Sequence, residues 1–206
     1  MVDSLLAAGL NVAAIAHALA AAGFNAVSVT ADTPLFARSI ATLASTFGQQ
    51  QLLTVGASSV SSPDAVRAAA AAGARFVSST EARAEVVAAA AALGITSLPG
   101  VRGAADAASA LDMGATALKL FPAASVGAGA LRGIRGLGGV MEHVPVIAAG
   151  GLEPESLQSL IDAGASGFAI GSTLYRGGDS PRDVARRAAL FAAAAAASAP
   201  LPLLPL

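Results

Sequence analysis

The stretch Ala117-Leu118-Lys119-Leu120-Phe121-Pro122-Ala123 decides how the rest of the chain is interpreted. Its apolar run predicts a buried strand that ends at Pro122, and it holds the only lysine among 206 residues. Burial in apolar surroundings disfavours the charged form of an amine, and a neutral lysine amine can form a Schiff base with a carbonyl group. The run alone is equally compatible with a lysine that reaches the strand end or pairs with a carboxylate.

The same unit recurs along the chain: an Ala-rich helix, a Gly turn and a short strand. After a first strand, strands are predicted at 25–30, 52–57, 75–78, 95–98, 116–121, 144–148 and 167–170. Helices are predicted at 11–23, 34–48, 63–73, 81–94, 104–114, 127–138, 154–164 and 181–197. Strands separated by helices run parallel and need cover on the outside. The pattern predicts an α/β fold, a (β/α)₈ TIM barrel, with a doubly wound open sheet as the alternative.

The N-terminal strand is the weakest part of this pattern. Only Met1–Gly9 precedes the first helix, so Val2–Leu6 is predicted to form a short first strand or none. We predict that residues 1–199 form a single barrel domain. Residues 200–206 alternate Pro and Leu and are predicted to form an extended end, because Pro suits neither a helix interior nor a central strand.

Composition limits the classes of function. The net charge is −1 with no basic run, which argues against a nucleic-acid partner. The absence of cysteine excludes disulfides and thiolate chemistry, and no grouping of His, Asp and Glu resembles a metal site. Residues 4–31 carry no charged side chain, but Gly23 divides them into a helix and a strand rather than a membrane span. The N-terminus lacks the basic segment of a secretory signal, so a cytoplasmic location is expected.

Two Gly-containing loops are the sharpest signal after the lysine. In a parallel barrel, functional residues lie on the loops that follow the carboxyl ends of the strands. Ala149-Gly150-Gly151 follows the seventh predicted strand and Gly171-Ser172-Thr173 follows the eighth. Small residues let backbone N–H groups approach an anion, so these loops predict a phosphate site. The same glycines also suit tight strand–helix turns.

These stretches resemble a known family, the class I aldolases that cleave 2-keto-3-deoxy-6-phosphogluconate and its galactonate epimer. The resemblance runs from about residue 11 to about residue 195, and the Lys-Leu-Phe-Pro-Ala run at 119–123 is its most specific part. The run Leu174-Tyr175-Arg176-Gly177-Gly178 looks more like the galactonate branch. Further matching runs are at 22–27, 55–57, 98–101, 115–118, 147–152 and 171–173.

The resemblance implies an activity and a set of site residues. It implies cleavage of 2-dehydro-3-deoxy-6-phosphogalactonate to pyruvate and D-glyceraldehyde 3-phosphate by a homotrimer that needs no metal or other cofactor. Lys119 would form the Schiff base. The residues expected to bind phosphate or substrate are Gly150, Gly151, Gly171, Ser172 and Pro122.

The chain departs from the family pattern at three places. The family's catalytic Glu on the second strand is Ser28 here, within Val27-Ser28-Val29, and Ser alone cannot act as a general base at neutral pH. An Arg-Gly pair at the end of the first strand is replaced by Leu5-Leu6-Ala7, and a Gly-Thr-Val run is Ser58-Ser59-Val60.

These departures leave two interpretations open. Ser28, Glu81 and Asp32 are the candidates for a proton relay, and Arg102 lies after the fifth strand as a possible anion contact. If none of them serves, the chain is a catalytically impaired homologue that binds a phosphorylated sugar acid or pyruvate.

Overall fold

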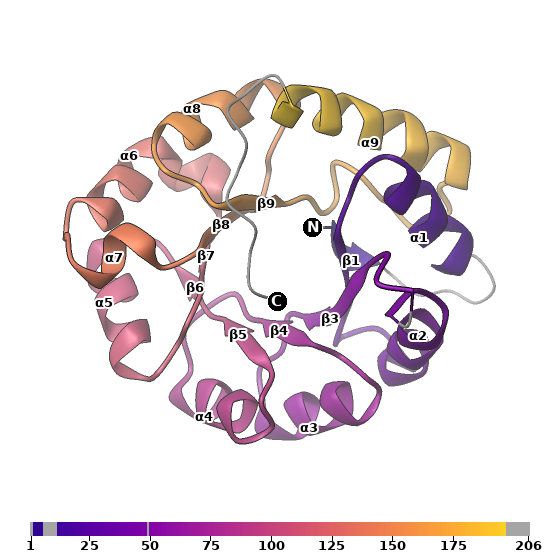
Figure 1. Cartoon of the computed structure of the whole chain (residues 1–206), viewed down its shortest axis with the longest axis horizontal. Helices are drawn as coiled ribbons and strands as arrows, with labels where there is room; N and C mark the ends of the chain where they lie inside the picture. The colour runs from indigo at the N-terminus through magenta and orange to yellow at the C-terminus, as the bar shows by residue number, and fades with distance from the viewer. Residues whose placement is uncertain (1, 6–11, 49, 197–206) are drawn as a thin grey trace.

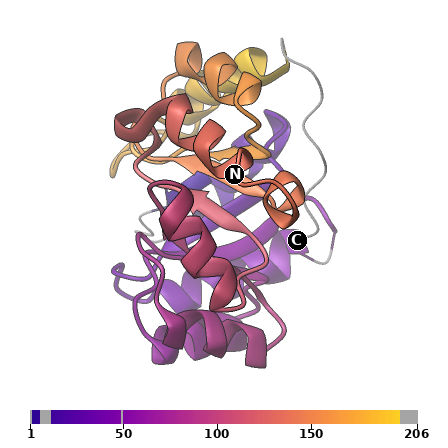
Figure 2. The same cartoon turned by 90° about the vertical axis from the view of Figure 1, so that its left-hand side faces the viewer.

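The computed structural model describes residues 2–5, 12–48 and 50–196. Its strands form a central ring, and its helices form an outer ring around them (Figure 1). Viewed from the side, helices lie above, below and in front of the strands (Figure 2). The predicted TIM barrel is therefore confirmed. In the part of the chain that the structure describes, no helix is long and apolar enough to cross a membrane.

Every strand pair in the ring is parallel. One sheet has the order β1-β2-β3-β4-β5 and the other the order β6-β7-β8-β9. The strands are β1 Val2–Leu5, β2 Ala26–Thr30, β3 Thr54–Ser58, β4 Phe76–Ser78, β5 Thr96–Leu98, β6 Gly100–Val101, β7 Leu118–Leu120, β8 Val146–Ala149 and β9 Gly167–Ala169.

The helices begin and end close to the predicted positions, because Pro and Gly mark their boundaries. The clearest case is α3, where Pro63 occupies the first turn and the Ser62 side chain accepts a hydrogen bond from the Ala65 N–H. The helices are α1 Val12–Ala21, α2 Phe36–Leu43, the π-helical turn η2 Ala44–Gly48, α3 Pro63–Ala71, α4 Ala84–Ala92, α5 Ala104–Asp112, α6 Ala123–Arg135, α7 Val140–His143, the 3-10 turn η3 Pro154–Ser156, α8 Leu157–Asp162 and α9 Pro181–Ala196.

The fifth barrel strand is broken at Pro99 and resumes at Gly100–Val101, which corrects the prediction that it ends at residue 98. The segment before Pro99 pairs with β4, and Gly100–Val101 pairs with β7. Pro has no N–H to donate to a ladder, while its carbonyl accepts the Lys119 N–H at 2.9 Å. Gly100 is required there, because a Cβ atom would lie 2.2 Å from the Thr80 carbonyl oxygen.

Two helix predictions also needed correction. The helix expected from about residue 127 begins at Ala123, and Gly127 interrupts it with a non-helical backbone (φ 70°). The short helix α7 was not predicted, because its four residues carry too little periodicity to be recognised.

The first strand forms and is four residues long, as the short-strand prediction expected. It pairs with β2 at Val2↔Val27 and Leu5↔Val29. Among the described strands no ladder joins β1 to β9. The predictions for residues 6–11 and for the end at 200–206 lie outside the described residues.

Alternation along the strands separates two apolar layers. Val27, Val29, Leu118 and Leu120 belong to the large cluster between strands and helices. The intervening side chains face the barrel interior. The interior cluster is made mostly of small or compact residues: Ala26, Phe76, Leu98, Ala117, Ile147, Ala149 and Ala169.

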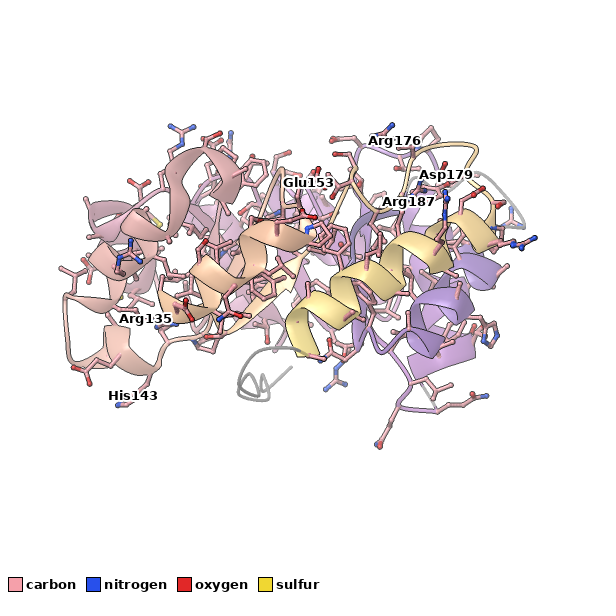
Figure 3. The ribbon with its side chains drawn as sticks, turned by 90° about the horizontal axis from the view of Figure 1, so that it is seen from above. Arg135, His143, Glu153, Arg176, Asp179 and Arg187 are labelled. Atoms are coloured by element: carbon pink, nitrogen blue, oxygen red, sulfur yellow. The ribbon has the colours of Figure 1, made fainter. Side chains whose placement is uncertain are left out.

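Arg135 ties together the amino-terminal end of the barrel. Its guanidinium donates hydrogen bonds to the carbonyl oxygens of Met141, Val144 and Gly164, at 2.7–3.0 Å, and to the Ser166 hydroxyl at 3.2 Å. Figure 3 shows Arg135 near the edge of the molecule opposite Arg176. Burial lowers the pKa of Arg135 from its usual value. The hydrogen bonds join α6, α7 and the turns that precede β8 and β9.

We predict that Arg135→Met lowers the free energy of unfolding by about 2 kcal/mol, because buried carbonyl oxygens lose their donor. Arg132→Met is the matched control, since Arg132 is exposed on the preceding turn of the same helix. Chemical denaturation of the three proteins measures the difference. Equal losses in both variants would contradict a specific role for Arg135.

Candidate active site

Lys119 lies inside the barrel on the middle residue of β7. Its neighbours Leu118 and Leu120 face the helices, so alternation turns the lysine side chain to the interior, where it is 2% exposed. In the ladders Lys119 pairs with Gly100 on one side and with Ile147 on the other. The amine is therefore held within a largely apolar wall, as the sequence predicted for this strand.

Phe121 links the lysine to the first Gly loop. The Lys119 Nζ atom lies 5.0 Å from the centroid of the Phe121 ring, within the range of a cation–π contact. A Cβ atom on Gly150 would lie 2.8 Å from the same ring and 3.0 Å from the Pro122 Cα atom. Gly150 also has φ 93°, so its backbone conformation and the close approach both require glycine.

The two Gly loops lie beside each other at the carboxyl ends of β8 and β9. Ala149 pairs with Ala169 in the ladder, which brings Gly150-Gly151 next to Gly171-Ser172. Gly151 and Ser172 are exposed, while Gly150 and Gly171 are partly buried. The four predicted phosphate-site residues thus form one rim of the barrel mouth, next to Phe121 and Pro122.

A partly buried ion pair holds the loop that follows β9. Arg187 on α9 pairs with Asp179 and donates from Nε to the Leu174 carbonyl at 2.8 Å. Asp179 also accepts the Arg176 N–H at 2.8 Å, and the Arg176 Nε atom donates to the Ser172 carbonyl at 3.2 Å. Figure 3 shows Arg176, Asp179 and Arg187 together near one edge, on the same side as Glu153.

Tyr175 lies under this loop and is 7% exposed. Burial raises the pKa of its hydroxyl, and the nearby Asp179 carboxylate adds to the increase. The tyrosine therefore stays neutral at physiological pH and acts as part of the packing beneath the loop.

The three proton-relay candidates lie in different environments. Ser28 is fully buried and shares the inward face of β2 with Ala26. Asp32 is exposed on the loop after β2. The Glu81 carboxylate pairs with Arg83 at the start of α4 and is 61% exposed. Of the three, Ser28 is the one inside the barrel with Lys119.

Glu81 and Arg102 line a polar groove outside the barrel interior. The groove has a volume of about 240 Å³ and opens between the loop after β4 and helix α5. Its lining residues are Thr80, Glu81, Ala82, Gly100, Arg102, Asp106, Ser109 and Met113. The structure therefore places the side chains of Glu81 and Arg102 beside the barrel wall rather than next to Lys119.

Sequence reasoning did not bring together the inward hydroxyls at the ends of three strands. Thr30, Ser58 and Ser78 are the last residues of β2, β3 and β4, and each is buried. The signal in the sequence was a polar residue at a position where the two-residue alternation of each strand turns the side chain inward. In the described part of the chain, no group of three or more His, Asp or Glu side chains comes together as a metal site would require.

Comparisons with known proteins found similar sequences and similar structures. A family model described as KDPG and KHG aldolase matches residues 3–186. The chain is 36% identical over 180 residues to the 2-dehydro-3-deoxy-6-phosphogalactonate aldolase of Escherichia coli (strain K12). The aligned residues make up 86% of each protein. A solved native KDPGal structure has a TM-score of 0.84 at 34% identity and covers 89% of this chain and 87% of that one.

A further similar structure carries a reaction intermediate. It is the KDPG aldolase from Legionella pneumophila with pyruvate captured at low pH as a covalent carbinolamine intermediate. Its TM-score is 0.74 at 25% identity, covering 94% of this chain and 90% of that one.

We predict that Asp179→Asn loosens the loop after β9, because the Arg187 guanidinium loses its charged partner. Amide hydrogen exchange should then be at least about tenfold faster over residues 171–180, which corresponds to about 1.4 kcal/mol. Arg186→Met is the control, because Arg186 lies on the same helix but pairs with Asp183 at the surface, at 3.6 Å. Unchanged exchange in Asp179→Asn would show that packing alone orders the loop.

Proposed function

We propose that this chain, which belongs to the KDPG and KHG aldolase family, cleaves 2-dehydro-3-deoxy-6-phosphogalactonate to pyruvate and D-glyceraldehyde 3-phosphate. The family consists of class I carbon–carbon lyases. The observation that carries the proposal is the single buried lysine, Lys119, beside the Gly loops at the barrel mouth. The similarity to the galactonate enzyme across most of both chains supports the choice of substrate.

The proposed reaction begins at the Lys119 amine. The neutral amine attacks the C2 carbonyl of the keto acid, and the carbinolamine that results loses water to become an imine. The C3–C4 bond then breaks, with its electron pair moving toward the imine nitrogen while the C4 hydroxyl loses its proton. The products are glyceraldehyde 3-phosphate and an enamine, which takes a proton at C3 before hydrolysis releases pyruvate and the free amine. The carbinolamine in the Legionella pneumophila relative supports the first step.

The phosphate end of the substrate is proposed to occupy the two Gly loops. Gly150, Gly151, Gly171 and Ser172 present backbone from adjacent strand ends, and backbone N–H groups on such loops suit a phosphate. Pro122 lies against Gly150, next to the Phe121 ring that contacts Lys119. The homotrimer expected from the resemblance stays a prediction.

Proton transfer is expected to be the slowest part of the reaction, because Ser28 stands where the family has its catalytic Glu. General acid–base help contributes about 10²–10⁴-fold to a rate. Ser28 is the relay candidate that lies in the barrel interior, and a hydroxyl there orients water rather than taking a proton unaided. We therefore propose slow turnover with imine formation retained. The presence of Ser28, and not a carboxylate, inside the barrel also favours the second candidate, an impaired homologue that binds a phosphorylated sugar acid or pyruvate.

We predict that borohydride in the presence of pyruvate adds one pyruvyl-derived mass to the peptide that contains Lys119. Peptide mapping by mass spectrometry separates this label from any on the N-terminal amine. Lys119→Arg keeps the positive charge but cannot form the imine, so it should lose the label and the cleavage activity together. A label that persists in Lys119→Arg would show that another amine reacts.

We predict that Ser28→Glu raises kcat by at least about tenfold, because it places a carboxylate where the reaction needs a base. Ser28→Gln is the size-matched control, and a thermal melt of both variants checks that the buried site accepts the longer side chain. A pyruvate-coupled assay measures the rates. The opposite pattern, in which Ser28→Glu gains nothing while Glu81→Gln or Asp32→Asn abolishes cleavage, would move the relay to a loop carboxylate.

A further inference from the structure

Three hydroxyl side chains form one row across the carboxyl ends of β2, β3 and β4. Thr30 pairs with Ser58 in the ladder. Gly56 pairs with Phe76 and Ala57 with Val77, so the same register continues from Ser58 to Ser78. We call Thr30, Ser58 and Ser78 the hydroxyl row. Their exposed fractions are 8%, 1% and 1%.

The hydroxyl row faces the barrel interior. On β4, Phe76 belongs to the interior cluster and Val77 to the outer layer, so alternation turns Ser78 inward. On β2, Ala26 is in the interior cluster and Val29 in the outer layer, which turns Thr30 inward as well.

The row is short of hydrogen-bond partners. Thr30 Oγ1 and Ser58 Oγ are 3.4 Å apart, at the long limit of a hydrogen bond. The Ser78 Oγ atom is inaccessible and has no hydrogen-bond partner among the described residues. A buried polar group without a partner costs about 1–3 kcal/mol, and such a group in a native fold requires an explanation. A ligand that accepts hydrogen bonds would supply one.

The position of the row suggests which ligand. In Figure 1, β3 and β7 lie on opposite sides of the central ring, and β4 follows β3 along the ring toward β5. The row therefore begins on the wall that faces Lys119 and continues around the interior to β4. The inward wall near Lys119 is apolar, with Ala117, Ile147 and Ala149 in its cluster. A substrate bonded to Lys119 would thus meet hydroxyl donors on the part of the interior wall formed by β2, β3 and β4.

We propose that the hydroxyl row binds the carboxylate of the keto acid while Lys119 holds the adjacent C2 atom. This inference rests on the proposed function. A carboxylate accepts several hydrogen bonds, and those from hydroxyl groups to an ionised oxygen are short and strong. The row recognises the carboxylate without a guanidinium or a second amine: among the described residues that are buried, the basic side chain is Lys119 itself. Ser78 is the residue on which the proposal depends most, because the described protein gives its hydroxyl no other partner.

The test compares pyruvate with methyl pyruvate, which has the same keto group but no negative charge. Borohydride trapping is measured over a range of ligand concentrations for the wild-type protein and for Ser78→Ala. We expect Ser78→Ala to raise the half-saturating concentration of pyruvate by about tenfold, since a hydrogen bond to a charged group contributes that much or more. Methyl pyruvate should change less than about twofold. The double variant Ser58→Ala, Ser78→Ala should weaken pyruvate further.

Ser97→Ala is the matched control. Ser97 is also a buried strand serine, but it pairs with Val77 of the outer layer, so it faces the helices. We expect it to leave both half-saturating concentrations unchanged. Melting temperatures of the variants separate a structural role from a binding role. A lower melting temperature for Ser78→Ala, with an unchanged pyruvate to methyl pyruvate ratio, would overturn the proposal.

Two further outcomes are informative. If pyruvate and methyl pyruvate weaken equally, or neither changes, the row holds an ordered water only and the proposal is wrong. If wild-type protein takes up no label at Lys119, the proposed function fails, and calorimetric titration of pyruvate into wild type and Ser78→Ala then tests the row without the imine. Equal pyruvate affinity in that titration would overturn the proposal independently.

Discussion

The burial of one amine inside a ring of parallel strands is the constraint on which the rest of this structure depends. Placing the Lys119 side chain in the interior carries a desolvation cost, because an ammonium in low dielectric loses its hydration. The barrel makes room for it with small inward residues such as Ala117 and Ala149. The backbone at this point is fixed by the Pro99 carbonyl, and the Phe121 ring contacts both the amine and Gly150. The break in the fifth strand and the tight Gly loop therefore support the same side chain.

The polar chemistry of the described interior comes from hydroxyl groups and this one amine. Every buried polar side chain in the described ranges is Ser, Thr, Tyr175 or Lys119, and none is Asp or Glu. Hydroxyls bind carboxylates and orient water, but they do not take protons at neutral pH. Such a barrel is better suited to forming and holding an imine than to moving protons rapidly. Substrate binding is thus expected to be retained in this chain more fully than turnover.

The two ends of the barrel are stabilised by different arginines. At the amino-terminal end Arg135 binds carbonyl oxygens of three segments, which is a contribution to stability. At the carboxyl end Arg187 binds Asp179 and the Leu174 carbonyl, and so orders the loop that carries Ser172. This division agrees with the general rule for these barrels, in which the carboxyl ends of the strands hold the site.

Much of the fold and part of the site were predictable from the sequence, because their signals are local. Repeated helix, Gly and strand units predicted the parallel barrel, and the lone lysine in an apolar run predicted an inward amine at Lys119. The pairing of strands was decided only by the tertiary structure. Gly100 is a strand residue because the tertiary structure places Pro99 between the two sheets. Glu81 points away from the barrel interior because of the way the loop after β4 folds. Thr30, Ser58 and Ser78 are separated by 20 residues or more, and only the ladder register brings their hydroxyls into one row. Periodicity along a chain specifies which face a residue occupies, but the partner across the strand depends on contacts between distant segments.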